Sequence, residues 1–199
     1  MHKLPSTFYT RITLIVAKSL LGKIFIRKIG NKILSGKIIE VEAYLRNDPA
    51  CHAYRGMTER NKVMFNGGGH LYVYFTYGIH YCANIVTNKK GIGEAVLIRA
   101  VEPIGGIEVM MKNRFKDGAH RKDGHHLKDL TNGPAKFAQA FGMTMKQNGI
   151  SLLGDEIFIA EGETIPSSKI VTTTRIGISV AQEKKWRFYI KDNLWVSKR

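Results

Sequence analysis

The amino-acid sequence predicts a single α/β domain of the α+β type, in which strands joined by turns are flanked by helices. With 199 residues, of which 44% are hydrophobic, the chain can bury one core and is short for two domains. Several hydrophobic runs alternate with period two and are joined by turn residues, which is typical of hairpins. Other runs recur at helical spacing. We therefore expect one domain over residues 1–199, without internal repeats or linkers.

The first predicted element is a helix near the N-terminus. Hydrophobic residues recur at helical spacing between positions 12 and 20, and Thr10 can cap the start of this helix. Gly22 follows as a C-terminal stop. We expect this helix to support the core.

A long hairpin is predicted next. Residues 23–29 alternate, residues 30–31 form a turn, and residues 33–44 alternate again. Period-two alternation places Glu40, Glu42 and Tyr44 on one face of the second strand. If that face borders a cleft, Glu42 and Tyr44 point into it together.

The rest of the chain predicts a second hairpin, a further strand and short elements after it. Residues 46–70 are rich in Gly and predict mostly loop, with a short helix near residues 59–64. The remaining predicted elements are a hairpin of strands 71–76 and 79–86 with its tip at Tyr77-Gly78, a strand 96–101 ending at Glu102-Pro103, a helical and then charge-rich segment 105–130, a helix from Pro134 to Phe141, and short strands within 157–189.

The charge balance indicates a polyanionic partner. The chain has 31 Lys and Arg residues against 16 acidic residues, which gives a net charge of +15. Binding to nucleic acid is favoured by this charge, because each neutralised phosphate releases a condensed counterion. The alternative is that the charge serves only solubility.

Other classes of protein are not favoured by the sequence. No apolar run approaches the roughly 20 residues of a membrane span, and no signal-peptide pattern is visible, so we expect a cytoplasmic protein that acts where the DNA lies, which is the nucleoid in a bacterium. Cys51 and Cys82 lack CxxC spacing, which argues against a disulfide framework or a zinc site. His120, His125 and His126 have no carboxylate or Cys at ligand spacing, so no metal or other cofactor is expected.

The aromatic run at residues 71–81 predicts a surface that can open a duplex. Tyr72 and Tyr81 are expected to fill the core of a sheet. Tyr77 has little interior to pack into, because it lies beside Gly78 at a hairpin tip. An exposed aromatic side chain can enter between base steps, unstack them and leave room for an extruded nucleotide.

A pocket for that nucleotide is predicted from a second group of residues. Tyr44, Tyr74 and His52 could hold an extruded base between aromatic faces. Glu42 shares a strand face with Tyr44, and Arg99 on another strand offers a cationic partner, so Glu42 can serve as a general base for water. The alternative is a glutamate that only faces solvent, and Glu40 is expected to be an ion-pair partner.

The chain resembles the alkyladenine (3-methyladenine) DNA glycosylase family over nearly its whole length. The resemblance rests on Glu40-Val41-Glu42-Ala43-Tyr44, His52, residues 58–61, Met64-Phe65, residues 69–84, Leu97-Ile98-Arg99-Ala100, Gly133-Pro134-Ala135-Lys136 and Arg175-Ile176-Gly177. It implies a curved, mainly antiparallel sheet with helices packed around it.

The resemblance also implies roles for individual residues. Glu42 would be the general base, with Arg99 and the main-chain carbonyl of Ile176 holding the water. The base would stack between Tyr44 and His52 with Tyr74 against its other side, Asn84 would exclude the amine of guanine, Tyr77 would intercalate, and the DNA contacts would come from Met64, Ile79, His80, Arg60 and Lys136.

The function implied is excision of alkylated or deaminated purines from duplex DNA by a monomeric enzyme. No lysine lies in the segment around Glu42, so we expect a monofunctional glycosylase without Schiff-base lyase activity. One alternative is a non-catalytic RNA- or DNA-binding module, which would give Glu42 no task. A deaminase is the other alternative, and its zinc signature is absent from the sequence.

Overall fold

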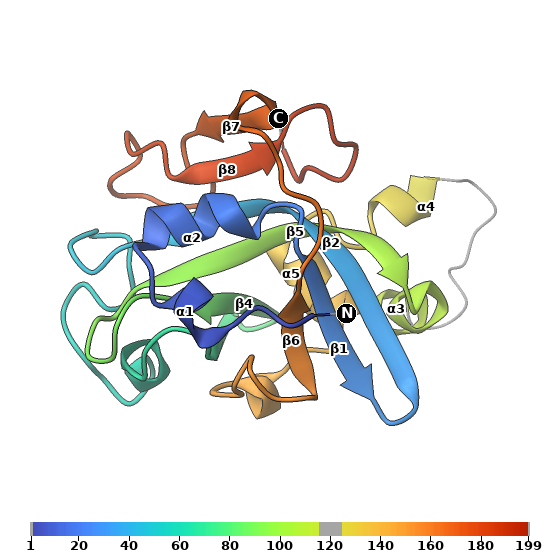
Figure 1. The fold of residues 1–199 in the computed structure, drawn as a ribbon, viewed down its shortest axis with the longest axis horizontal. Helices are drawn as coiled ribbons and strands as arrows, with labels where there is room; N and C mark the ends of the chain where they lie inside the picture. Colours follow the sequence, from blue (N-terminus) through green and yellow to red (C-terminus); the bar gives the residue numbers. More distant parts are fainter. Residues whose placement is uncertain (1, 116–124, 199) are drawn as a thin grey trace.

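The computed structural model describes residues 2–115 and 125–198, and of His125 and His126 only the backbone. Its eight strands form one curved sheet in which every pairing is antiparallel (Figure 1). The predicted α+β class is confirmed. The strands are β1 (Ile24–Ile29), β2 (Lys32–Tyr44), β3 (Leu71–Thr76), β4 (His80–Val86), β5 (Ala95–Gly105), β6 (Ile157–Ala160), β7 (Ile170–Thr173) and β8 (Arg187–Ile190).

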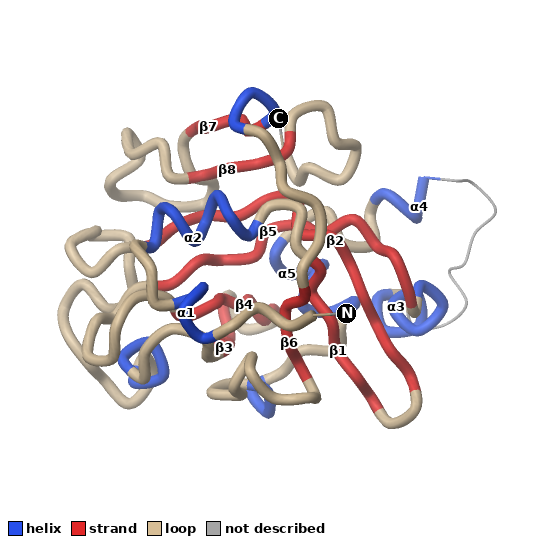
Figure 2. Tube along the Cα trace, viewed as in Figure 1, coloured by secondary structure: helices blue, strands red, loops and turns tan. Residues whose placement is uncertain are grey.

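The strands follow the order β3-β4-β5-β2-β1-β6, and β8 pairs with both β2 and β7. Short helices surround this sheet, as the tube in Figure 2 shows. The α-helices are α1 (Ser6–Tyr9), α2 (Thr13–Leu20), α3 (Ile107–Arg114), α4 (His125–Lys128) and α5 (Pro134–Ala140), and the 3-10 helices are η1 (Lys62–Phe65), η2 (Met145–Gln147) and η3 (Ser167–Lys169).

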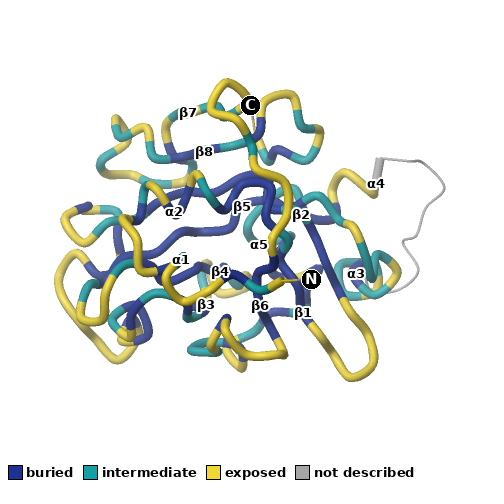
Figure 3. Tube along the Cα trace, viewed as in Figure 1, coloured by how far each residue is buried: buried dark blue, intermediate teal, exposed yellow. Residues whose placement is uncertain are grey.

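The core lies between the sheet and two of these helices. Helix α2 packs against β2 and β5, and α5 packs against β4 and β5. Phe137 of α5 and Phe141, which caps its C-terminus, meet the ring of Phe25 on β1 edge-on, at centroid distances of 5.2 and 5.4 Å. Figure 3 shows that burial is continuous along the central strands, whereas the loops are exposed. The long buried strands are therefore a firm support for side chains at their ends.

The predicted cap of the first helix is wrong. Thr10 ends α1, and α2 begins at Thr13 without a side-chain cap. The side chain of Ile12, expected in the core, is 63% exposed. The helix still buries Val16 and Leu20, as expected, and its start lies two residues later than predicted.

Strand β5 does not end at Glu102-Pro103 as predicted. It continues to Gly105, with Pro103 opposite Gly36 of β2. Strand β4 pairs with β5 only at residues 95–97, so the other side of β5 carries no strand partner at Pro103 among the described residues. A proline is tolerated at such a position because its missing N–H group is not needed there.

The pairing of β2 with β5 contains irregularities on both sides of Glu40. Ile38 pairs with Val101 and Glu40 with Ala100, which leaves Ile39 as an extra residue on β2. Val41 then pairs with Ile98, so Arg99 is the extra residue on β5. Such β-bulges re-aim side chains locally and occur often beside active sites. Here they flank the acidic residues that the sequence singled out.

The tip of the β3–β4 hairpin is a three-residue loop, Tyr77-Gly78-Ile79, because Thr76 pairs with His80, so β4 begins one residue later than predicted. Tyr77 and Gly78 have φ angles of +52° and +69°. Two positive φ angles match the twist of a hairpin, but they favour Gly or Asn over tyrosine. The turn therefore holds a large aromatic side chain at a position where the backbone does not favour one.

Candidate active site

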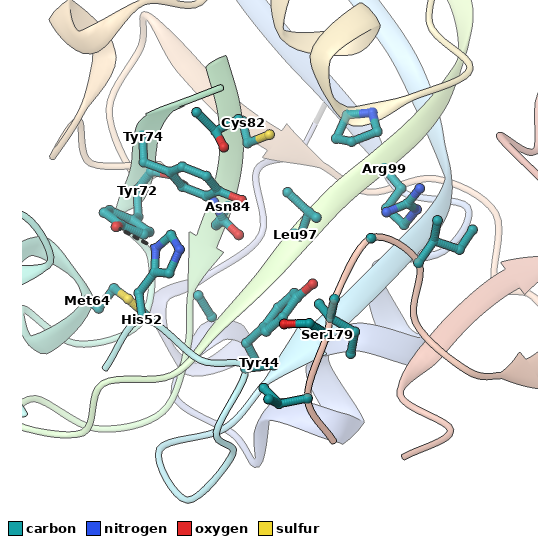
Figure 4. Close-up of a pocket in the computed structure, with 18 of the residues that line it drawn as sticks. Tyr44, His52, Met64, Tyr72, Tyr74, Cys82, Asn84, Leu97, Arg99 and Ser179 are labelled. Atoms are coloured by element: carbon teal, nitrogen blue, oxygen red, sulfur yellow. Dashed lines mark hydrogen bonds between the residues drawn. The ribbon is translucent and has the colours of Figure 1, made fainter. Parts of the chain in front are cut away.

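A cavity of about 490 Å³ lies where β2, β3, β4 and β5 meet the loops that follow β2 and β7. Its walls are mostly aromatic and apolar, with a few polar groups (Figure 4). The side chains discussed below that line it are Tyr44, His52, Met64, Tyr72, Tyr74, Tyr77, Cys82, Asn84, Leu97, Arg99, Pro134, Ile176, Ser179 and Val180.

Two aromatic walls face each other across the cavity. Figure 4 shows Tyr44 on one side and His52, Tyr72 and Tyr74 on the other. The ring of His52 meets that of Tyr74 edge-on at 4.5 Å, and its Nδ1 lies 2.9 Å from the hydroxyl of Tyr72. The histidine is thus fixed by two tyrosines on adjacent positions of one strand face. The space between the walls is a slot suited to a flat ring.

The ionisable groups of these walls are held neutral. His52 is exposed at the slot, but partial burial of its ring and the positive charge of Arg60 lower its pKa. Burial raises the pKa of Tyr72 to about 12. It also raises the pKa values of Tyr74 and Tyr44, and for Tyr44 the charge of nearby Glu42 adds to this effect. The slot therefore presents uncharged aromatic faces at neutral pH.

The carboxylate of Glu42 lies just behind the cavity wall. It accepts hydrogen bonds from the hydroxyl of Tyr44 at 2.9 Å and from the backbone N–H of Ile176 at 2.8 Å. Nη1 of Arg99 forms an ion pair with Oε1 of Glu42, at 3.2 Å. Its side chain is 0% exposed, and its three partners all line the cavity. Since a carboxylate has about four acceptor sites, one remains free.

Arg99 connects Glu42 with a second buried carboxylate. Its Nε lies 3.1 Å from Glu40, which also accepts from Nε of Arg187 and from the backbone N–H of Ser197, both at 2.6 Å. Burial alone would lower the pKa of Arg99, but Glu42 and Glu40 raise it. Glu40 is therefore an ion-pair partner, as predicted, and it fixes the guanidinium that holds Glu42.

Asn84 lies on the floor of the cavity. Its Nδ2 donates to the carbonyl of Tyr72 at 3.1 Å, on the paired strand. That bond fixes the side-chain amide, which is also part of the cavity lining.

Comparison with known proteins places this geometry in a family. The family model described as methylpurine-DNA glycosylase (MPG) matches residues 7–194. The chain belongs to the methylpurine-DNA glycosylase family. It is therefore a DNA glycosylase with DNA as its substrate, which agrees with the net charge of +15.

Relatives in this family are similar over almost their full length. A protein of Carboxydothermus hydrogenoformans with the name "Putative 3-methyladenine DNA glycosylase" is 49% identical over 98% of this chain and 99% of its own. Proteins of the same name are 52% identical in Francisella tularensis, over 94% of both chains, and 48% identical in Clostridium acetobutylicum, over 98% and 97%. The similarity thus extends through both cavity-forming loops.

The hairpin tip of this glycosylase projects beside the cavity. Tyr77 is 81% exposed and forms part of the cavity rim, and Ile79 is 71% exposed. His80, at the start of β4, is also exposed. These three residues lie where the sequence predicted contacts with a duplex.

Met64 does not lie with them. Its side chain is 2% exposed and packs with Val63 and Tyr72 in a small cluster below the cavity. A surface contact with a duplex was expected for Met64, but this packing makes it part of the cavity wall.

Two cations on the same glycosylase were expected to contact DNA. The guanidinium of Arg60 lies 5.9 Å from the ring centre of Tyr74 and is exposed. Nζ of Lys136, near the start of α5, lies 2.8 Å from Asp129 and 2.8 Å from Asn132. These two contacts use two of the three N–H donors of Lys136, which leaves one for a phosphate.

Several cavity residues of this glycosylase were not singled out from the sequence. Tyr72 was expected only in the core, yet its alternation with Tyr74 could have placed both on the cavity side. Leu97 had a similar signal, since it lies two positions before Arg99. The loop residues Ser179 and Val180 had none, because irregular backbone has no periodicity.

Three further observations concern the described residues only. No group of three or more His, Cys, Asp and Glu residues there is arranged to hold a metal ion, and His120 lies outside them, as do the side chains of His125 and His126. None of the helices in residues 2–115 and 125–198 has the length and apolar character of a membrane span. Cys51 and Cys82 are both buried free thiols.

Proposed function

We propose that this glycosylase binds an alkylated or deaminated purine turned out of duplex DNA and hydrolyses its N-glycosidic bond, leaving an abasic site. The observation that carries this proposal is the carboxylate of Glu42, held by two hydrogen bonds and the ion pair with Arg99 beside a slot with aromatic walls. A slot of this kind suits a single extruded base, because duplex DNA hides the bond that must break.

The reaction needs only a water and a carboxylate. Alkylation of a ring nitrogen makes the purine cationic, so it leaves with the electron pair of the broken bond while the sugar becomes oxocarbenium-like. The water oxygen then bonds to the sugar carbon, and Glu42 takes the released proton. A neutral deaminated base would also need a proton on the leaving purine.

The free acceptor position of Glu42 is where the water would bind. The carboxylate has no exposed surface, and its partner Tyr44 forms one wall of the slot. Oε2 accepts the hydroxyl of Tyr44, and we propose that its second acceptor site takes the water from the side of the slot. Arg99 and the carbonyl of Ile176 would then hold that water in place.

The remaining residues would recognise the base and the duplex. The base would stack between Tyr44 and His52 with Tyr74 beside it, and Asn84 would reject the amine of guanine. Tyr77 would fill the gap in the duplex, while phosphate and groove contacts would come from Ile79, His80, Arg60 and Lys136. Met64, which is buried, would act only through the cavity wall.

The enzyme is proposed to be monofunctional and to act as a monomer without a cofactor. No lysine is among the residues that line the cavity in the described part of the chain. A lyase step through a Schiff base needs such an amine. Hydrolysis by Glu42 would therefore end at the abasic site.

The test is a duplex that contains one lesion, either 7-methylguanine or hypoxanthine. The enzyme should make the strand break on treatment with alkali and should leave it intact without alkali. Breakage without alkali would contradict the monofunctional assignment. Tight binding of the lesion without any alkali-labile site, for either base, would favour a binding module instead.

A further inference from the structure

Arg175 is the most extensively bonded cation beside the cavity, although it does not line it. Its side chain is 0% exposed. Nη1 donates to Oδ2 of Asp48 and, at 3.1 Å, to the carbonyl of Ala43. Nη2 donates to Oδ1 of Asp48 at 3.0 Å and to the carbonyl of Ala181 at 3.4 Å. All four N–H groups of the two terminal nitrogens are thus in use.

These bonds join three walls of the slot. Asp48 begins the loop that carries His52, and Ala43 lies between Glu42 and Tyr44 on β2. Ala181 ends the loop of residues 176–180 that lines the opposite side. The residue next to Arg175 is Ile176, whose N–H group bonds Glu42. A single guanidinium therefore fixes both the spacing of the slot and the donor on the proposed general base.

The same guanidinium lies over the ring of Tyr44, 4.7 Å from its centre. Tyr44 lines the cavity and Arg175 does not, so the cation covers the ring from behind. A positive charge there would repel a cationic base stacked on the front of the ring. Asp48, which is fully buried, supplies the opposite charge, and Nζ of Lys184 lies 3.7 Å from it at the protein surface.

We propose that Arg175 is a positioning residue that holds the slot and the Ile176–Glu42 contact, and that Asp48 cancels its charge so that the slot can take a positively charged base. This inference rests on the proposed function and adds a preference to it. Arginine is required here, because lysine offers a point charge instead of a planar fork. The cancellation matters only for cationic lesions, since a neutral base has no net charge to repel.

The test compares single-turnover excision of 7-methylguanine, which is cationic, with that of hypoxanthine, which is neutral. Enzyme concentration is varied to give a half-saturating concentration and a maximal rate for each duplex. Arg175→Lys should lower the maximal rate for both lesions about tenfold or more, because the slot and the Ile176 donor lose their common anchor. Arg27→Lys is the matched control, since Arg27 is a buried arginine bonded to the carbonyl of Phe141, away from the cavity.

Asp48→Asn should raise the half-saturating concentration about tenfold for 7-methylguanine and less than twofold for hypoxanthine. A tenfold change in the half-saturating concentration is the size expected when a unit charge on the order of 10 Å from the base is removed, at an effective dielectric constant of about 20. In Asp48→Asn, the maximal rate of excision of 7-methylguanine should not fall below that of hypoxanthine. The reason is that the cationic base becomes neutral as it leaves the sugar. An equal change for both lesions would overturn the charge argument and leave Asp48 purely structural.

Lys184→Gln keeps the charge argument testable if Asp48→Asn does not fold. Lys184 is partly exposed, and removing its charge should shift the ratio of the two half-saturating concentrations about twofold in favour of 7-methylguanine. A ratio that stays constant, or Arg175→Lys behaving like Arg27→Lys, would overturn the proposal. If the unaltered enzyme excises neither lesion, the proposed function itself fails, which is a separate outcome.

Discussion

The hydroxyl of Tyr44 lies 2.9 Å from Oε2 of Glu42, two positions earlier on strand β2. The alternation of a strand thus places a stacking surface and a carboxylate on one side, and a hydrogen bond joins them. A base that stacks on Tyr44 would have its sugar near Glu42. Glutamine has the same shape as glutamate, so Glu42→Gln tests the carboxylate at this contact.

Glu42→Gln should lower single-turnover excision by a factor on the order of 10²–10⁴, the usual range for a positioned general base. The glutamine oxygen can still accept from Ile176 and Arg99, and its amide can donate to the hydroxyl of Tyr44, so the fold and lesion binding should survive. A binding titration beside the excision assay separates these effects. Glu94→Gln is the control, since Glu94 is a buried carboxylate that bonds Thr13. Near-normal excision by Glu42→Gln would refute the catalytic role.

Tyr77→Ala should weaken lesion binding and slow excision without changing the melting temperature by more than a few degrees. Its side chain is 81% exposed, so truncation leaves no core cavity. Alanine would take the same positive φ as tyrosine, so the backbone strain of the turn should not change. The fluorescence of a base analogue at the lesion reports flipping. Tyr54→Ala, at a half-exposed tyrosine away from the hairpin tip, is the control. Normal flipping in Tyr77→Ala would remove the wedge assignment.

Lys136→Ala should reduce the slope of log affinity against log salt by about one for undamaged duplex. The loss of affinity itself should be small, because Asp129 and Asn132 already offset part of the charge and donors that Lys136 offers to a phosphate. Lys32→Ala is the control, since Lys32 lies at the opposite end of β2 from Tyr44. Equal slopes in the enzyme and in Lys136→Ala would show that this lysine does not reach the backbone.

Asn84→Ser should raise excision of undamaged guanine relative to hypoxanthine, if the amide guards the slot. The serine side chain is smaller and leaves room for the exocyclic amine of guanine. The alternative is that Asn84 serves only the carbonyl of Tyr72. In that case a folded variant keeps its base selectivity. Measuring how much guanine and hypoxanthine each enzyme releases from duplex DNA distinguishes the two outcomes.

His52 should make stability depend on pH below its ordinary pKa of 6.5. Burial lowers the pKa in the folded state, so the unfolded chain takes up a proton first as the pH falls. The contribution of His52 to stability is complete above pH 6.5 and is lost as the pH falls through the lower, folded value. The difference in free energy of unfolding between the enzyme and His52→Gln should therefore shrink from pH 7.5 to pH 5. A constant difference would show that His52 does not titrate in this way.

The strands were predictable where local pattern decides them. The hairpins around residues 30–31 and 77–78 follow from alternation and turn residues, and both are confirmed. The extension of β5 through Pro103 was not predictable, because it depends on which side of that strand lacks a partner. Similarly, Thr10 has the chemistry of a cap, but the short helix α1 before it shifts the start of the next helix.

The residues of the candidate site could be predicted from the sequence, but the contacts that hold them in place could not. Glu42, Tyr44 and Arg99 could be singled out by type and strand position, and their contacts agree with that choice. The bond between Asp48 and Arg175 joins residues 127 positions apart, and no periodicity in the sequence connects them. Pairings of this kind arise only when two loops fold onto the same strand end.

The two β-bulges around Glu40 compensate for each other. Ile39 adds one residue to β2 and Arg99 adds one to β5, so the two shifts cancel, and Val41 and Ile98 resume the alignment that Ile38 and Val101 had. The strand pairs on either side of the two bulges therefore keep the same register. Deleting Ile39 alone would slip the rest of β2 by one residue and exchange its two faces, both of which are buried at residues 40–43. A paired loss of Ile39 and Arg99 would restore a regular ladder, but it would remove one fully buried core side chain together with the guanidinium between Glu40 and Glu42.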